Sequence, residues 1–261
     1  MSTALITGAS DGIGKAFAEE LAAYNTNLVL VARSEEKLNQ LAKQLQEKYK
    51  VQVDIVVKDL TETGATNDVF DAVKSKGLTI DLLINNAGFA EYGDFAEKDE
   101  ERQVKIVQLN ILALVDLTHK FLQQMRQRRS GSIINVSSLT AFQPMPYLSV
   151  YAASKAFIVS FSQALWAENR DYGVRVLVTC PGPVETDFLA KAKFPPALAA
   201  RTNKISTSQE VVRESLKALE RGDPTVVIGG FSTHFISKLS RFVPRKTLLS
   251  LLAKQFKTKT V

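Results

Sequence analysis

The chain has 261 residues, of which 45% are hydrophobic and 23% charged, and this composition excludes a disordered or collagen-like protein. Its single cysteine, Cys180, excludes an intrachain disulfide, and with only two histidines no metal site is expected. The formal net charge of +6 arises in residues 231–261, which hold seven basic side chains and no acidic one. The rest of the chain is close to neutral, which argues against a nucleic-acid-binding protein.

Short runs of apolar and β-branched residues alternate with helical patterns along most of the chain. The expected strands span residues 4–7, 28–32, 51–57, 82–85, 132–137, 174–180 and 225–229. The expected helices span residues 12–24, 35–49, 68–76, 97–128, 151–169 and 208–221. Strands that are apolar throughout are buried on both faces, and regular alternation of strand and helix predicts crossovers between parallel strands. The sequence therefore predicts one doubly wound α/β domain over residues 1–230, with its ligands beyond the carboxyl ends of the strands.

A glycine-containing turn, TGASDGIG at residues 7–14, joins the first expected strand to the first helix. Glycines let the backbone approach a phosphate closely, and the helix that follows presents unpaired N–H groups and a positive dipole end to it. The alternative is a turn with no ligand, but its position at the first strand–helix connection favours a dinucleotide site. The candidate residues in this turn are Gly8, Ser10, Asp11, Gly12, Ile13 and Gly14.

The second expected strand ends near Arg33, at a position where an acidic residue would accept a hydrogen bond from the ribose 2′-hydroxyl of NAD. Arg33 instead offers several donors that suit a 2′-phosphate, so NADP(H) is the expected cofactor, with Ser34 and Lys37 as helpers. Asp59, just past the third strand, is placed to accept a hydrogen bond from the adenine amino group, and Leu60 beside it joins the candidate site. The alternatives are a solvated loop position for Arg33 and a helix N-terminal acid at Asp59.

Ser138 follows the fifth expected strand, and Tyr151 and Lys155 stand four residues apart on the next helix, where they share one face. A free tyrosine has a pKa of about 10, but a lysine cation about 4 Å away contributes roughly 4 kcal/mol at an effective dielectric of about 20. That interaction would lower the pKa of the phenol to about 7, a range suited to general acid–base catalysis. Ser138 would donate a hydrogen bond to the substrate oxygen. A solvated pair on a helix face is the alternative.

Taken in order, the motifs resemble those of the short-chain dehydrogenase/reductase family, in its cytosolic, NADP-preferring branch. They are TGASDGIG at 7–14, NNAG at 85–88, Asn110, Ser138, YAASK at 151–155 and PGPVET at 181–186. The chain is similar in this respect to ketoacyl reductases and hydroxysteroid dehydrogenases. The resemblance implies a Rossmann-type parallel sheet of about seven strands with helices on both faces, a nicotinamide cofactor and an oxidoreductase activity.

The resemblance also implies a role for each matching residue. Tyr151 would be the general acid–base, Ser138 would polarise the substrate carbonyl, and Lys155 would lower the pKa of Tyr151 and bind the nicotinamide ribose. Asn110 would hold a water molecule that links Lys155 to solvent. The chain departs from many members at Ala141, which replaces a glycine and is expected to reshape the substrate wall. The other residues implied to line the cofactor are Asn86, Ala87, Gly88, Pro181, Gly182, Val184 and Thr186.

The expected reaction interconverts a ketone and a secondary alcohol by hydride transfer. The variable segments around the motifs are mostly apolar, which predicts a bulky apolar substrate such as a steroid-like, retinoid-like, aromatic or fatty ketone. The alternative is that several of these side chains pack only against one another. A non-catalytic NADP-binding sensor of the same fold is disfavoured because Tyr151 and Lys155 are both present. The candidate substrate residues are Ser138, Thr140, Phe142, Met145, Tyr151, Phe188 and Phe194.

Residues 231–261 are expected to form a basic, amphipathic helical extension, divided into two helices by Pro244. Three roles are open for it: a substrate lid, a subunit contact, or a peripheral contact with an anionic membrane surface. The resemblance implies a homodimer or homotetramer built on the helices near residues 97–128 and 151–170. The N-terminus lacks the pattern of a signal peptide and no apolar run reaches about 18 residues. A cytoplasmic protein is therefore expected, with any membrane contact confined to the extension.

Overall fold

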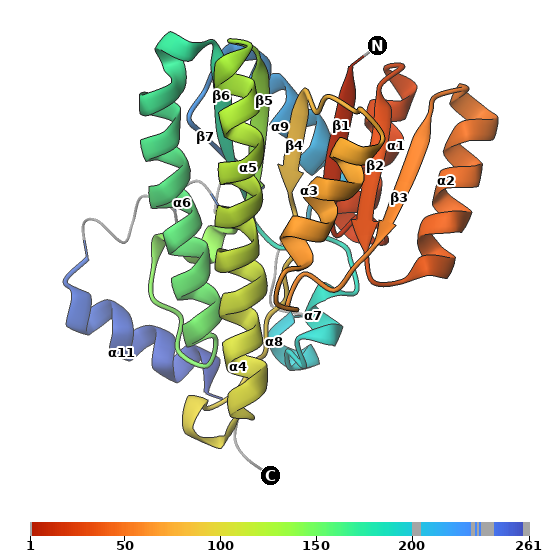
Figure 1. Cartoon of the computed structure of the whole chain (residues 1–261). Helices are drawn as coiled ribbons and strands as arrows, with labels where there is room; N and C mark the ends of the chain where they lie inside the picture. Colours follow the sequence, from red (N-terminus) through yellow and green to blue (C-terminus); the bar gives the residue numbers. More distant parts are fainter. Residues whose placement is uncertain (1, 200–204, 231–232, 234, 236–242, 258–261) are drawn as a thin grey trace.

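The computed structural model describes residues 2–199, 205–230, 233, 235 and 243–257. Within these residues seven parallel strands form one sheet in the order β3-β2-β1-β4-β5-β6-β7, which confirms the predicted doubly wound architecture (Figure 1). The strand order reverses between β1 and β4, and open α/β sheets bind their ligands in the crevice at such a switch point. The strands are β1 (Thr3–Thr7), β2 (Asn27–Ala32), β3 (Val53–Val57), β4 (Leu82–Asn85), β5 (Gly131–Val136), β6 (Val174–Pro181) and β7 (Thr225–Ile228).

Helices cover both faces of the sheet, because successive residues of each strand point to opposite faces. Ile6 of β1 belongs to the same buried cluster as Phe17 on one face, and its neighbour Leu5 to the same cluster as Phe121 on the other. The sheet is thus buried on both sides, as its apolar strands predict. The first face carries α1 (Gly12–Ala23), α2 (Glu35–Tyr49) and α9 (Ser208–Arg221). The second carries α3 (Ala65–Ser75), α5 (Leu114–Gln127) and α6 (Ser149–Asn169), seen in front of the sheet in Figure 1.

The helix predicted over residues 97–128 is interrupted. Phe95–Glu97 form a separate 3₁₀ turn, and Asp99 caps α4 (Glu100–Val107), which continues through a π-helical turn, η2 (Gln108–Ala113), into α5. A π-helical turn holds an extra residue, and such turns are frequent at functional sites. Here the wide turn contains Asn110, whose side chain is buried between the neighbouring segments.

The other predicted elements lie close to their predicted bounds. Three of them differ by a few residues at their start, and one of these is α6, which begins at Ser149 instead of residue 151. Gly64, with a φ of 80°, precedes α3, which therefore begins at Ala65, before the predicted position. Strand β3 begins at Val53, because Lys50 ends α2 in the left-handed conformation and the chain needs further residues to reach the sheet.

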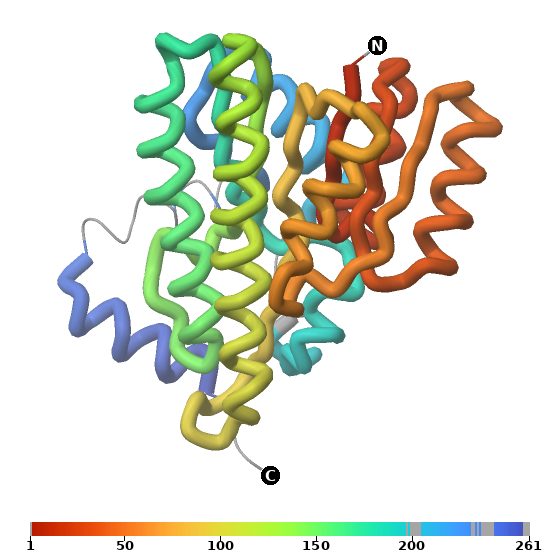
Figure 2. Tube along the Cα trace, viewed as in Figure 1, coloured from red at the N-terminus to blue at the C-terminus, as the bar shows by residue number. Residues whose placement is uncertain are grey.

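The described part of the C-terminal extension contains α11 (Arg245–Phe256), which begins directly after Pro244 as predicted. The first expected helix of the extension falls mostly on residues outside the described ones. Leu248 and Leu252 are buried, and the ring of Phe256 lies 6.3 Å from that of Phe194. Figure 2 shows α11 at the end of the molecule where α6 begins. Within the described ranges, none of the helices combines the length and the apolar character needed to cross a membrane.

Candidate active site

The carboxyl ends of β1, β4, β5 and β6 open into a cavity of about 1310 Å³. Pockets for a single small ligand are commonly about 300–1,000 Å³, so this cavity is large enough for more than one ligand. Most of the predicted site residues line it. They are Gly8, Ser10, Asp11, Gly12, Ile13, Arg33, Asp59, Asn86, Ala87, Gly88, Ser138, Thr140, Met145, Tyr151, Lys155, Pro181, Gly182, Val184, Thr186, Phe188 and Phe194.

In the glycine turn after β1, the backbone at Gly8 and Gly14 lies too close to neighbouring backbone atoms for a side chain. A Cβ atom on Gly8, whose φ is +66°, would lie 2.9 Å from the Cα atom of Ala87, and one on Gly14 would collide with the Gly8 carbonyl oxygen. Gly14 does not line the cavity, and close packing explains why a glycine stands there. Its predicted contact with the cofactor stays a prediction. Asp11 caps α1 by accepting a hydrogen bond from the Gly12 N–H at 2.8 Å. The N-terminus of α1 therefore faces the cavity, and its glycines leave room for the pyrophosphate of a dinucleotide.

Arg33 and Asp59 line the edge of the cavity beyond β2 and β3. The guanidinium lies 3.6 Å from the Asp59 carboxylate, and the Arg33 side chain is 77% exposed, so it can turn to meet a phosphate. Burial acts to raise the pKa of Asp59, but hydrogen bonds from Thr61 and the charge of Arg33 outweigh it, and the pKa is lowered. Asp59 is therefore an anion, and it accepts a hydrogen bond from the Thr61 N–H at 2.9 Å.

Three further residues predicted to help bind the cofactor do not line the cavity. Ser34 occupies the N-cap position of α2, Lys37 is exposed on that helix, and Leu60 is buried in the core. Arg33 and Asp59 reach the cavity because they lie directly at strand ends. Leu60 is used in apolar packing, whereas the Ser34 side chain makes no capping hydrogen bond and the charge of Lys37 helps to lower the pKa of Asp11. The predicted contacts of Ser34 and Lys37 with the cofactor stay predictions.

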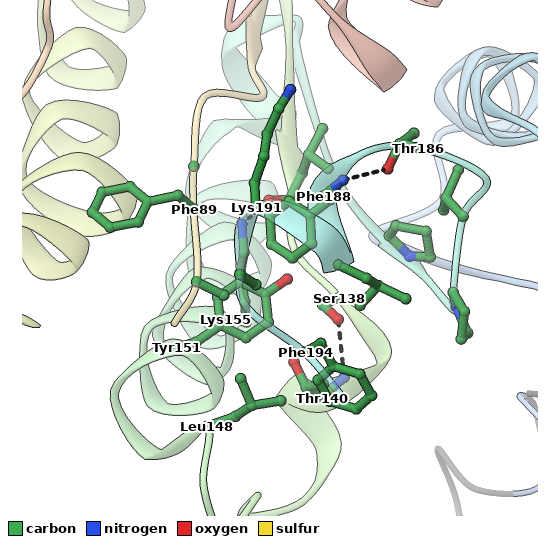
Figure 3. A pocket seen from close by; sticks show the side chains of 18 of the residues that line it. Phe89, Ser138, Thr140, Leu148, Tyr151, Lys155, Thr186, Phe188, Lys191 and Phe194 are labelled. Carbon is green, nitrogen blue, oxygen red and sulfur yellow. Dashed lines mark hydrogen bonds between the residues drawn. The ribbon is translucent and has the colours of Figure 1, made fainter. Parts of the chain in front are cut away.

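Ser138, Tyr151 and Lys155 line one wall of the cavity, and Figure 3 shows them together. Ser138 follows β5, and its hydroxyl accepts a hydrogen bond from the Thr140 N–H at 3.2 Å. Tyr151 and Lys155 lie on the inner face of α6 and are only 8% and 4% exposed. The Lys155 ammonium donates to the Val136 carbonyl oxygen at 2.9 Å and lies 5.7 Å from the centre of the Tyr151 ring. The sheet and α6 thus hold the three side chains at one place.

The ionisation of Tyr151 differs from the sequence-based expectation. Burial raises the pKa of Tyr151 to about 12, and a hydrogen bond with Ser138 opposes this only in part. Burial also lowers the pKa of Lys155 to about 8. The predicted lowering of the phenol pKa fails because the ammonium turns toward Val136, while removal from water disfavours the phenolate. In the chain itself Tyr151 is a neutral hydrogen-bond donor.

Asn110 lies behind the cavity wall rather than in it. Its side-chain oxygen accepts a hydrogen bond from the Phe89 N–H at 3.1 Å, and its amide nitrogen donates to the Ser154 hydroxyl at 3.0 Å. A Cβ atom on Gly88 would lie 3.0 Å from that oxygen and 3.5 Å from the Lys155 ammonium. Asn110 therefore joins the loop after β4 to α6, close to Lys155. Its predicted role in holding a water molecule stays a prediction.

The opposite side of the cavity is apolar. The ring centres of Tyr151 and Phe188 are 5.6 Å apart, and Met145 and Phe194 belong to the same cluster. Thr140 lines this region, and its buried hydroxyl has no hydrogen-bond partner in the described part of the chain. Phe142, the remaining residue predicted to contact the substrate, does not line the cavity, because its side chain packs against the separate cluster around Ile158.

The sequence motifs did not single out three parts of the lining: the start of α4, with Asp99, Glu101, Arg102 and Lys105, the residue Lys191, and the helix α11. Lys191, the last residue of α7 (Phe188–Lys191), forms an ion pair with Asp11 of the glycine turn. The inner face of α11 also reaches the cavity, and its carbonyl at Phe256 accepts a hydrogen bond from the Tyr92 hydroxyl. No motif marks these contacts, because they join segments far apart in the chain; the apolar pattern of the extension is the only signal. The lining residues of α11 are Leu248, Leu251, Leu252, Gln255 and Phe256.

A parallel sheet with a glycine turn at its switch point, beside a wall of serine, tyrosine and lysine, defines a Rossmann-type oxidoreductase. The family model described as short chain dehydrogenase matches residues 2–195, and the chain belongs to this family. It is an oxidoreductase of CH–OH groups, and its cofactor is a nicotinamide dinucleotide, NAD(P)(H). The resemblance found in the motifs is thereby confirmed.

Curated relatives match most of the chain. The 17-beta-hydroxysteroid dehydrogenase type 3 of Mus musculus is 35% identical over 259 residues, which cover 97% of this chain and 80% of that protein. The very-long-chain 3-oxoacyl-CoA reductase of Homo sapiens is 38% identical over 198 residues, which cover 74% of this chain and 62% of that protein.

Solved structures are similar over the whole length. A short-chain dehydrogenase from Sphingobium yanoikuyae in complex with NADPH has a TM-score of 0.83 at 28% identity, covering 100% of this chain and 98% of that one. A structure from work on 7beta-hydroxysteroid dehydrogenase stereoselectivity has a TM-score of 0.87 at 28% identity, covering 97% of this chain and 96% of that one.

Proposed function

We propose that this protein interconverts a bulky apolar ketone and its secondary alcohol with NADP(H). The observation that carries the proposal is one cavity that joins the glycine turn, the side chains of Ser138, Tyr151 and Lys155, and an apolar lining completed by α11. Relatives named as a hydroxysteroid dehydrogenase and an oxoacyl-CoA reductase support a lipophilic carbonyl substrate.

A bound nicotinamide dinucleotide supplies the hydride in ketone reduction and accepts it in alcohol oxidation. The Ser138 hydroxyl donates a hydrogen bond to the substrate oxygen and stabilises the charge that develops there. In reduction the Tyr151 hydroxyl donates its proton to that oxygen, and in oxidation the tyrosinate form of Tyr151 accepts the proton of the alcohol. Burial, which raises the pKa of Tyr151 to about 12, keeps this proton in place until the oxygen becomes basic. Lys155 would hold the nicotinamide ribose and, as a cation, would stabilise the tyrosinate left behind.

The preference for NADP(H) rests on Arg33. Its exposed guanidinium presents several donors at the end of β2, where an NAD-specific site would place a carboxylate. Asp59, which also lines the cavity, would accept a hydrogen bond from the adenine amino group. The solved relative that holds NADPH supports the preference. Asn86, Ala87 and Gly88 would hold the adenosine ribose, and Pro181, Gly182, Val184 and Thr186 would hold the nicotinamide amide, since all of them line the cavity.

The apolar end of the cavity takes the body of the substrate, and α11 serves as its lid. Leu248 and Leu252 turn inward, while Lys246 and Lys254 are exposed on the outer side. Residues 1–230 are then the catalytic domain, and α11 is the part of the extension, residues 231–261, that covers its cavity. The exposed side of α11 would offer an anionic membrane the charges of Lys246 and Lys254 together with the exposed side chains of Leu249 and Leu251.

A cytoplasmic location with peripheral membrane contact is the corresponding proposal for the outer face of α11. The test is binding of the full chain to anionic vesicles at low salt. Binding that is salt-sensitive and lost on truncation after Gly230 would support the contact, and no binding at low salt would end it.

A homodimer or homotetramer is proposed on the helices α4, α5 and α6 and the turn η2. Exposed apolar side chains on these elements support this, among them Val104, Leu112 and Phe157. Light scattering during size exclusion should give the mass of two or four chains, and Leu112→Glu should lower it. A monomer mass for the unaltered protein would refute the proposal.

The catalytic proposal is tested by NADPH oxidation with ketones of graded size, on the unaltered protein and on Tyr151→Phe. Bulky apolar ketones should turn over, and Tyr151→Phe should lower kcat at least about a hundredfold while the Kd for NADPH changes little. A Tyr151→Phe variant that keeps more than about a tenth of the activity would refute the role of Tyr151. NADPH binding without turnover of any ketone would favour the non-catalytic sensor.

A further inference from the structure

Lys191 lies outside every motif described above, yet its ammonium lies at the glycine turn. It forms an ion pair with the Asp11 carboxylate and lies 3.7 Å from the carboxylate of Asp187. Lys191 and Asp11 both line the cavity, and the Lys191 side chain is 59% exposed. Figure 3 shows this side chain extending away from Tyr151. The pair therefore joins the segment after β6 to the turn after β1, remote from the proton-transfer groups.

Asp11 places a negative charge where the phosphates of a dinucleotide bind. Its carboxylate caps α1 through the Gly12 N–H, so it is fixed at the helix N-terminus. The hydrogen bond between the two side chains lowers the pKa of Asp11 and raises that of Lys191, so both are ionised at neutral pH. Alone, the Asp11 carboxylate would repel a pyrophosphate and oppose the attraction of the helix dipole. A cation is needed at this position if the turn is to hold phosphates well.

We propose that Lys191 is a binding residue for the pyrophosphate of the nicotinamide dinucleotide, where its ammonium neutralises Asp11 and donates to the phosphate oxygens. The long, exposed side chain can move while its backbone stays fixed. The Lys191 N–H donates to the Asp187 carbonyl oxygen at 2.9 Å, and the next residue, Ala192, accepts from the Tyr92 N–H at 2.8 Å. The inference rests on the cofactor class alone and is independent of Tyr151 and of the substrate.

Lys191 and Arg33 should act on different parts of the cofactor. The 2′-phosphate near Arg33 is present only in NADPH, whereas the pyrophosphate is common to NADH and NADPH. Lys191 therefore sets the affinity for both nucleotides, and Arg33 sets the difference between them. Equal weakening of NADH and NADPH binding therefore indicates the role of Lys191, whereas weakening of NADPH binding alone indicates that of Arg33.

The experiment is a fluorescence titration of the full chain with NADH and with NADPH, at low and at high salt. Lys191→Met should raise both Kd values by a similar factor of about ten, and Lys191→Arg should restore most of the affinity. The matched control is Lys193→Met, two residues further on, whose side chain is 70% exposed and pairs with Glu91 outside the cavity lining. Its Kd values should stay within about twofold of the unaltered protein.

Asp11→Asn separates an electrostatic role of Lys191 from a structural one. Asparagine caps a helix as well as aspartate does, but it carries no charge. Because repulsion is removed, this variant should bind both nucleotides at least as tightly as the unaltered protein. If Lys191 only anchored α7 through Asp11, Asp11→Asn would weaken binding as much as Lys191→Met does, and the proposal would fail. Unchanged Kd values in Lys191→Met, or a loss confined to NADPH, would also overturn it.

Discussion

Lys155 donates to the carbonyl oxygen of Val136 at 2.9 Å, and this contact points its ammonium at the end of β5 rather than at the hydroxyl of Tyr151. The side chains of Lys155 and Tyr151 are among the most buried ionisable groups of the described chain. Burial disfavours charge on both, so Tyr151 retains its proton to a higher pH and Lys155 releases its proton at a lower one. The pair is therefore a source of pH dependence in the fold itself.

We expect the free energy of unfolding to rise with pH because of Lys155. Its folded-state pKa of about 8 lies below the ordinary value of 10.5, so between these values the unfolded chain binds more protons than the folded chain. Stability then increases as the pH rises through this window. Between about pH 7.5 and pH 9, urea denaturation should show an increase about 1 kcal/mol larger for the unaltered protein than for Lys155→Met.

The comparison with Lys155→Met is needed because other groups titrate nearby. Burial raises the pKa of the Cys180 thiol to about 12, so Cys180 lowers stability as the pH rises above about 9, and Tyr151 does so above about 10. Because Cys180 and Tyr151 are present in both proteins, their contributions to the pH dependence of stability largely cancel in the comparison. The same pH dependence in the two proteins would contradict the assignment to Lys155.

Arg33→Ala should change the cofactor preference. With a 2′-phosphate, a guanidinium makes charge-assisted hydrogen bonds that a methyl group cannot replace, so the Kd for NADPH should rise about tenfold or more. The Kd for NADH should stay within about twofold, because the Arg33 side chain is 77% exposed and its pair with Asp59 contributes little to stability. Nucleotide fluorescence measures both values. An equal loss for the two nucleotides would show that Arg33 does not recognise the 2′-phosphate.

Leu252→Ser should weaken the recognition of bulky substrates. Leu252 is buried on the inner face of α11 and lines the cavity. Loss of its apolar surface should lower kcat/KM for a bulky ketone about tenfold, with little effect on a small ketone or on the Kd for NADPH. Lys254→Ser, on the exposed side of the same helix, is the matched control and should leave kcat/KM unchanged. If the two variants behave alike, α11 does not act as a lid.

Gly14→Ala should destabilise the fold by about 3 kcal/mol, because the new Cβ atom meets the fixed backbone oxygen of Gly8. Gly64→Ala is the contrast, since its Cβ atom meets nothing within 4 Å and only the φ of 80° is unfavourable. That variant should lose about 1 kcal/mol. Urea denaturation of both measures the difference. An equal loss would mean that the tight packing at Gly14 is relieved by a shift of the turn.

The order of strands and helices could be read from the sequence because local and global signals agree. Uninterrupted apolar strands and amphipathic helices bury the faces that their patterns predict, as Leu5 and Ile6 illustrate on opposite sides of β1. The π-helical turn at Gln108–Ala113 was not predicted, since its hydrophobic spacing still resembles an α-helix and only the contacts of Asn110 reveal it.

The residues of the candidate site could be predicted where a motif places them directly after a strand. For residues further along the loop after a strand, the motif does not indicate which way the side chain points. Leu60, for example, is buried in the core. Phe142 likewise joins the cluster around Ile158, because apolar residues in a loop have no periodicity to indicate which side they bury. The contact of Lys191 with Asp11 depends on tertiary structure alone. The pKa of Tyr151 also depends on burial, which a four-residue spacing cannot specify.

The π-helical turn η2 sets the rotation of α5 about the helix axis relative to the residues of the turn. Two residues, one in the turn and one on α5, each need a fixed orientation. Asn110 within the turn must face Phe89 and Ser154, while Phe121 on α5 must face the sheet. Removing one residue between Asn110 and Phe121 would rotate α5 by about 100° relative to the turn. Only one of the two side chains could then keep its contacts. We therefore expect insertions and deletions in this stretch to be destabilising, so that related chains should differ there mainly in the identity of exposed side chains.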